Sequence, residues 1–219
     1  MHKIFCGDLT RCVTCMPIEP PANEHSSPSG DEAARLAPWR DLGRSLRTWR
    51  LLRRVKQQHA AELVGVSQST ISRWENGAQR PSDEQAARLA DLLAAKPDTA
   101  SDRALLELVA GSAARVHLIC DLSHRLLAAS PARARDWRAP LQDLLGRSLW
   151  RYASAEIVDA ERRLSDLGWY DQSPPAIQLT TQANRSAEVP IVAGRVRWTR
   201  LRLSDGSFAR LVQLAETSD

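Results

Sequence analysis

The chain has 219 residues, a net charge of +4 and 43% hydrophobic residues, so it can form one large packed domain or two small ones. It lacks an apolar run of the roughly 18 residues that a membrane-spanning helix needs. It also lacks a continuous apolar segment near the N-terminus, which a secretory signal would require. We therefore expect a cytoplasmic protein that makes no membrane contact.

The first part of the chain, residues 1–38, differs in composition from the rest. It is rich in small polar residues and contains Pro17, Pro20, Pro21 and Pro28. Such a segment buries too little apolar surface to offset the entropy of folding. We expect a disordered N-terminal tail.

Three cysteines lie in this tail, Cys6, Cys12 and Cys15. The last two form a C-x-x-C pair, and His2 or His25 could add a further metal ligand. The second half of a zinc pattern is missing, and no strand–helix context supports a redox function for the pair. We assign no metal, and the role of the three cysteines stays open.

Four helices are predicted in the next part of the chain. In the first, Leu42, Leu46 and Trp49 follow the i, i+4, i+7 spacing of an amphipathic helix. The last begins at Ser82, whose capping-box partner is Gln85. Its apolar face consists of Ala86, Leu89, Ala90 and Leu93.

The two helices between them are short and joined by a tight turn. The earlier one, over 57–64, precedes Gly65, where a helix commonly ends in the left-handed conformation. Ser67 is suited to cap the later one, because its hydroxyl can accept from a free backbone N–H. Ile71 and Trp74 are three residues apart and are expected to face the core.

The exposed face of the later helix carries polar side chains that suit contact with base edges in a DNA major groove. They are Gln68, Ser69, Ser72 and Arg73, and the helix ends at Asn76-Gly77. Residues 42–95 contain nine Lys and Arg against five Asp and Glu, so an excess of +4 can neutralise phosphates there. The alternative for the arginines is an ordinary solvated helix face, in particular for Arg44, Arg47, Arg53 and Arg54.

Residues 42–93 resemble the XRE family, the helix-turn-helix proteins related to phage Cro and cI repressors. Spacing and residue type both match over the whole segment. The motifs are Leu42-Gly43, Leu46-Arg47, Arg50, Gln57, Gly65-Val66-Ser67, Ile71-Ser72-Arg73-Trp74-Glu75-Asn76-Gly77 and Pro81. The resemblance implies an all-α DNA-binding domain, which we place at residues 39–96.

The resemblance also implies roles for single residues. Gln57 would contact a phosphate, Gln68 and Ser69 would read bases, and Arg50 would pair with Glu75. The full set of predicted DNA contacts is Gln57, Ser67, Gln68, Ser69, Thr70, Ser72, Arg73 and Asn76. Two positions depart from the family pattern: Ala60 is smaller than usual and Lys56 replaces Thr or Asn. We expect a slightly thinner core and one more phosphate contact.

Plainer interpretations exist for the same residues. A helix–turn–helix of small residues can be mere packing in an all-α domain, and Gln57 and Arg73 can be solvated polar residues. Glu75 is expected to be structural and not to read bases.

A linker and connector helix are predicted over residues 97–113. The boundary lies at Lys96-Pro97-Asp98, and residues 102–110 have helical composition. We expect this helix to be a connector or a dimer contact through its apolar residues Leu105, Leu106, Leu108 and Val109.

The remainder, residues 114–216, predicts an α+β domain with an antiparallel sheet. Helical composition fills 132–168, and Asp205-Gly206 is a strong hairpin turn. Strands are predicted at 116–120, 124–129, 176–180, 195–203 and 207–215.

This order resembles a PAS domain, a five-stranded sheet that senses ligands, binds partners or dimerises. The motifs are looser than those of the first domain, and a generic α+β ligand or dimer domain is the alternative. They are Leu118-Ile119-Cys120-Asp121, Leu126-Leu127-Ala128-Ala129-Ser130-Pro131, Leu145-Gly146-Arg147-Ser148-Leu149 and the last hairpin.

No cofactor is identified for the PAS-like domain, and its small-molecule effector stays unknown. Histidine does not occur after His124, so a haem ligated from the central helices is not available. Cys120 lies in the first strand, which disfavours a flavin photoadduct, and is expected to be a small buried residue. His117 and His124 are expected as strand and turn residues. Core packing is expected for Trp137, Trp150, Trp169 and Trp198.

Three functional classes compete. A transcription regulator that binds double-stranded DNA as a homodimer fits both domains. An antitoxin-like interaction protein, whose C-terminal domain binds a protein partner, is the alternative. A self-cleaving repressor is disfavoured, because Ala110-Gly111 has no nucleophile segment to act on it and lysine does not occur after Lys96 to serve as base. We do not expect an enzyme.

Overall fold

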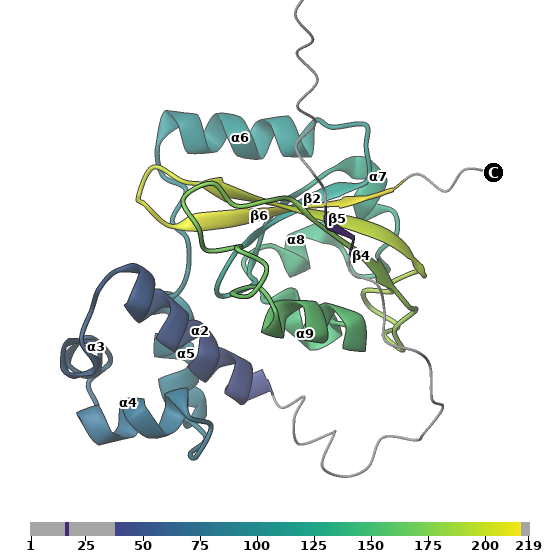
Figure 1. The fold of residues 1–219 in the computed structure, drawn as a ribbon. Coiled ribbons are helices and arrows are strands. Elements are labelled where there is room, and N and C mark those ends of the chain that lie inside the picture. The colour runs from purple at the N-terminus through teal and green to yellow at the C-terminus, as the bar shows by residue number, and fades with distance from the viewer. Residues whose placement is uncertain (1–15, 18–37, 216–219) are drawn as a thin grey trace, which may run out of the picture.

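The computed structural model describes residues 16–17 and 38–215. The expectations for the N-terminal tail, including its three cysteines, otherwise lie outside the described residues. The described part begins with a group of helices and continues into a sheet with helices on both faces (Figure 1). This is the predicted fold class, a helical domain followed by an α+β domain. No helix of the described part is long and apolar enough to span a membrane.

The helical domain consists of α2 (Pro38–Leu52), α3 (Gln57–Val64), α4 (Gln68–Glu75) and α5 (Asp83–Leu92). Local signals set these ends. Gly65 is left-handed, with φ of 74°, and closes α3. Ser67 accepts from Thr70 N at the start of α4, and Ser82 and Gln85 form the predicted capping box of α5.

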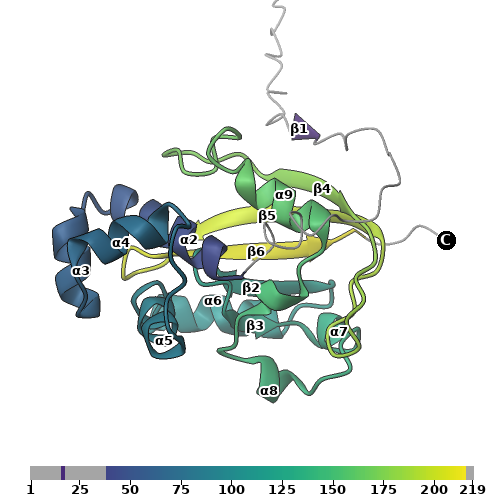
Figure 2. The same cartoon turned by 90° about the horizontal axis from the view of Figure 1, so that it is seen from below.

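The helices pack around a common apolar core. Leu46, Ile71, Trp74 and Leu89 are fully buried there. Ala60 is fully buried as well, so the small side chain at this position belongs to the core. α3 and α4 lie at the end of the helical domain that is away from the sheet (Figure 2).

The α+β domain has five antiparallel strands, in the order β4-β5-β6-β2-β3. Their bounds are β2 (Val116–Cys120), β3 (Leu126–Ala129), β4 (Ile177–Thr181), β5 (Gly194–Arg202) and β6 (Phe208–Leu214). The first and last strands of the domain pair at the centre of the sheet, because β6 lies between β5 and β2. The predicted PAS-like architecture is thereby confirmed.

A short strand in the N-terminal region departs from the sequence analysis. Met16–Pro17 forms β1, which pairs in parallel with β4 at the edge of the sheet. An edge strand has unpaired backbone groups that a neighbouring segment can use. These two residues therefore do not belong to a fully disordered tail.

Helices cover both faces of the sheet (Figure 1). On one face lies α6 (Ala100–Ala110), which packs on β2 and β3 through Val109. On the other face the central helices enclose a larger core that contains Trp137, Trp169 and Trp198. These central elements are α7 (Pro131–Ala134), α8 (Leu141–Leu144), the 3-10 helix η1 (Leu149–Tyr152) and α9 (Ala155–Arg162).

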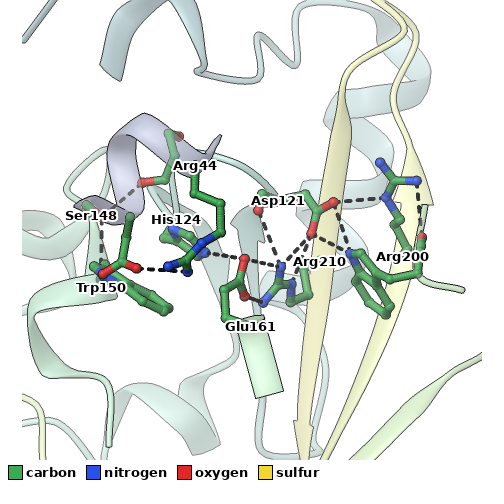
Figure 3. A network of polar contacts seen from close by, with 11 residues as sticks. Arg44, Asp121, His124, Ser148, Trp150, Glu161, Arg200 and Arg210 are labelled. Carbon is green, nitrogen blue, oxygen red and sulfur yellow. Dashed lines mark hydrogen bonds and ion pairs between the residues drawn. The ribbon is translucent and has the colours of Figure 1, made fainter. Parts of the chain in front are cut away.

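Charged side chains lie inside this larger core (Figure 3). Asp121 is fully buried and accepts from Arg200 Nε at 2.9 Å and from Arg210 Nη2 at 2.8 Å. Glu161 accepts from Arg210 Nη1 at 2.6 Å. Burial alone would raise the pKa of Glu161, but the guanidinium of Arg210 outweighs it and holds that pKa at about 2. The two carboxylates and two guanidiniums therefore neutralise one another.

The two domains are in direct contact. Arg125 Nη2 donates to Asp91 Oδ1 at 2.7 Å. Cys120 is buried as expected, but its thiol also bridges the boundary: Sγ donates to Leu93 O at 3.3 Å and accepts from Ala95 N at 3.2 Å. A further contact joins η1 to α2: the indole N–H of Trp150 donates to Oδ2 of Asp41, which lies in α2, at 2.8 Å.

Candidate nucleic-acid interface

The exposed surface of α4 carries the side chains that were predicted to contact bases. Gln68, Ser69 and Arg73 are exposed, as is Asn76 at the C-terminal end of the helix, while Ser72 is half-buried. Ile71 and Trp74 are fully buried on the opposite side of the helix. The buried side anchors α4, so its polar side is available to a groove.

Two of the predicted contacts, Ser67 and Arg73, form hydrogen bonds within α4 and its cap. Ser67 Oγ caps α4 and lies 2.8 Å from both Ser69 Oγ and Thr70 Oγ1. Arg73 leans back along the helix, with Nε donating to Ser69 O at 3.2 Å and Nη2 to Ser69 Oγ at 3.3 Å. Ser69 thus fixes the position of Arg73 on this surface.

A chain of polar contacts runs beneath this surface from α4 to α2. Gln68 Nε2 donates to Gln57 Oε1 at 2.6 Å, and Gln57 Nε2 donates to Glu75 Oε2 at 2.9 Å. Glu75 in turn accepts from Arg50, from Nε at 2.8 Å and from Nη2 at 2.9 Å. Gln57 is therefore both a candidate phosphate contact and the link that orients Gln68.

The pair of Arg50 and Glu75 is largely withdrawn from water. Their side chains are 15% and 3% exposed. The hydrogen bond to Glu75 raises the pKa of Arg50, and Arg50 Nη1 also donates to Val55 O at 3.2 Å. The two-pronged geometry fixes the distance between α2 and the end of α4.

The basic residues of this domain fall into two groups. Arg44, Arg80 and Arg88 each pair with a carboxylate three or four residues away. The pairs of Arg80 and Arg88 are exposed, which suits a solvated helix face, whereas Arg44 pairs with the buried Asp41. Among the described residues, no salt bridge is found for the exposed side chains of Arg47, Arg54 and Lys56. Lys56 directly precedes α3 and is the neighbour of Gln57 in the chain. The additional phosphate contact was expected from this residue.

One close contact between α2 and α4 was not anticipated. A Cβ on Gly43 would lie 2.1 Å from the carbonyl oxygen of Trp74, so only glycine allows the two backbones to approach this closely. The Leu42-Gly43 motif was visible in the sequence. Its steric reason depends on α4, which lies about thirty residues later in the chain.

A cavity of about 90 Å³ lies in the α+β domain, between the sheet and the central helices. Its wall is mostly aliphatic and aromatic. Strands β2, β5 and β6 form one side of the cavity, η1 forms a second, and the segment around Val189 and Val192 forms a third. The side chains with polar groups in the wall are His117, His124, Arg133, Trp150, Tyr152, Thr181 and Arg210. Within residues 16–17 and 38–215, no three His, Cys, Asp or Glu side chains lie close enough together to hold a metal ion.

These features define a helix-turn-helix domain joined to a PAS-like domain. Residues 41–104 match the model of a family described as a helix-turn-helix domain, a range that covers most of α2, all of α3, α4 and α5, and the first turn of α6. The match leaves the rest of the chain unassigned. No curated protein matches the chain.

Two solved structures are similar over longer stretches. The PAS domain of an HTR-like protein from Haloarcula marismortui is 15% identical, with a TM-score of 0.39, and the match covers 53% of this chain and 92% of that one. An RNA-binding light-oxygen-voltage receptor is 10% identical, with a TM-score of 0.38, and the match covers 85% of this chain and 62% of that one. These scores are too low to support conclusions on function.

Proposed function

We propose that this protein is a cytoplasmic, sequence-specific regulator of transcription of the XRE kind, acting as a homodimer with a sensory PAS-like domain. The main support is α4. Gln68, Ser69 and Arg73 are exposed together on one of its faces, while Glu75, Gln57 and Arg50 hold that face in place from below. A half-buried polar scaffold that holds an exposed polar helix face in place suits base reading.

Substitutions on this face test sequence-specific binding. Gln68→Ala and Ser69→Ala should each weaken binding to the preferred duplex by about 1–3 kcal/mol if the side chain contacts a base edge. The preferred sequence is first selected from a random duplex pool with the full chain. Affinity is then measured for that duplex and for a scrambled one at one fixed salt concentration.

The control variants separate the roles of neighbouring side chains. Gln57→Ala should weaken both duplexes, because it removes a phosphate contact as well as the support of Gln68. Gln58→Ala, an exposed neighbour on α3, should change neither. An equal loss on both duplexes for Gln68→Ala would remove this residue from the set of base contacts.

The homodimer is supported by an exposed apolar side chain outside the helix-turn-helix domain. Leu108 on α6 is 72% exposed, although its neighbours Leu105 and Leu106 pack against the sheet. Two helix-turn-helix domains that contact half-sites about one helical turn apart on an inverted repeat would bind far more tightly than one domain. We expect sedimentation velocity to show a dimer that Leu108→Glu weakens and Leu145→Glu, at a 44% exposed position, leaves intact. A monomeric wild-type chain at micromolar concentration would contradict the homodimer.

A further inference from the structure

Trp150 belongs to the wall of the cavity and to the contact between the domains. Its side chain lines the cavity in the PAS-like domain. Its indole N–H leaves the cavity wall and donates to Asp41 Oδ2 of α2 at 2.8 Å. Trp150 lies in η1, a four-residue 3-10 helix, whose hydrogen bonds have poorer geometry than those of an α-helix.

Trp150 also stacks on another side chain of the cavity wall, His124. The ring of His124 stacks on it, with centroids 4.6 Å apart and an interplanar angle of 29°. His124 Nε2 lies 3.3 Å from Glu161 Oε1, an ion-pair distance, but forms no hydrogen bond of good geometry. Glu161 is held by Arg210, as Figure 3 shows. Trp150 is therefore in contact with this buried network through His124 and with α2 through Asp41.

The charges of the cavity wall are already neutralised within the protein. Arg210 pairs with Glu161 and Asp121, and Arg133 pairs with Asp136 at 2.9 Å. Burial lowers the pKa of His117 well below its usual range, with a further contribution from Arg133, so its imidazole is neutral. An ionised ligand would find no free counter-charge here and would lose its hydration.

The Asp41 side of the contact is buried as well. Asp41 is 5% exposed and accepts from Arg44 Nη1 at 3.0 Å in addition to Trp150. Burial raises the pKa of Asp41 in spite of these partners. Loss of the indole N–H would leave this desolvated carboxylate with a missing donor, which is costly for the docked position of α2.

We propose that the cavity binds a small neutral, apolar molecule, no larger than a single aromatic ring, and that Trp150 transmits its occupancy to α2 through Asp41. This inference rests on the proposed function, since it specifies what the sensory domain senses and how the signal leaves it. The upper limit on the size of this molecule follows from the cavity volume of about 90 Å³. This volume is smaller than that of an apolar cavity of about 150 Å³, which binds benzene or xenon.

The same helix that carries Asp41 supports the reading face. Gly43 of α2 touches the backbone of Trp74 in α4, and Arg50 of α2 holds Glu75. An occupant that binds better when Trp150 is displaced shifts α2 away from its docked position, by as much as its affinity differs between the two states. The position of α4 changes with it.

The test uses the full chain and NMR. Benzene and xenon are added to protein labelled at the indole N–H groups and at the methyl groups of Val196 and Val212, which line the cavity. The Trp150 signal is assigned from its absence in Trp150→Phe. We expect the methyl signals and the Trp150 N–H signal to shift together, and amide exchange in α2 to rise several-fold. Benzoate, the charged analogue of benzene, should cause none of these changes.

Two variants at Asp41 isolate the coupling from the binding. Asp41→Asn keeps an acceptor for the indole and should keep the α2 response. Asp41→Leu removes the acceptor, so benzene should still shift the methyl signals while the exchange of α2 no longer responds. The inference is overturned if neither benzene nor xenon shifts the methyl signals, if benzoate binds as well as benzene, or if α2 responds equally in Asp41→Leu.

Titrations with DNA in the absence of either probe keep the two proposals apart. A protein that binds its duplex but not the probes refutes this inference and leaves the proposed function standing. A protein that shows the coupled response but binds no duplex refutes the proposed function and leaves the cavity and its link to α2 standing.

Discussion

Asp121→Ala is expected to destabilise the PAS-like domain by at least about 3–5 kcal/mol, the cost typical of removing one partner from a buried ion pair. Asp121 is fully buried and accepts from two arginines, Arg200 and Arg210, and from the indole of Trp169 at 3.1 Å. Its loss leaves Arg200, whose side chain is 2% exposed, without a carboxylate partner among the contacts described above. Many domains of this size have little more stability than that to lose.

Denaturation with urea, followed by circular dichroism, measures this loss. Asp159→Ala is the matched control, because it removes a carboxylate of α9 whose pair with Arg162 lies at the surface, with Asp159 65% exposed. It should change the free energy of unfolding by less than about 1 kcal/mol. A loss as small as this for Asp121→Ala would show that the buried network contributes nothing beyond an exposed pair.

The sequence could not reveal this network, although each of its members was visible. Asp121 directly follows the predicted strand 116–120 and lies in a turn, and Arg200 and Arg210 lie within predicted strands. The contacts join residues 79 and 89 positions apart. An arginine in an alternating strand normally indicates the solvent face, and only the paired register of β5 and β6 turns both inward next to Asp121.

The helix-turn-helix part was more predictable because its signals are local. The bounds of α3, the left-handed Gly65 and the caps at Ser67 and Ser82 each depend on residues within one helical turn. The strands of the PAS-like domain followed from two short apolar runs, from alternation at 176–180 and from the Asp205-Gly206 turn. The position of Trp150 between a cavity and α2 depends on the docking of two domains, and no local pattern encodes that.

Gly43→Ala is the second substitution for which we expect a large effect, and here two principles oppose each other. Alanine favours an α-helix over glycine by about 1 kcal/mol, so on helix propensity alone α2 should become more stable. The new Cβ would, however, lie 2.1 Å from Trp74 O and 2.8 Å from Trp74 C. These are backbone atoms of α4, which cannot rotate away as a side chain could.

The steric effect should therefore prevail. Restoring an ordinary contact distance of 3.4–4 Å requires α2 and α4 to separate by more than 1 Å, and overpacking of this kind costs about 1–3 kcal/mol or more. Separation also stretches the pair of Arg50 and Glu75, so DNA affinity should fall even where the protein stays folded. Thermal melting and duplex titration measure the two effects. Gly194→Ala, where a Cβ meets nothing within 4 Å, should leave both nearly unchanged. A melting temperature for Gly43→Ala at or above that of the wild type would mean that propensity prevails and that the close approach of the two helices is not required.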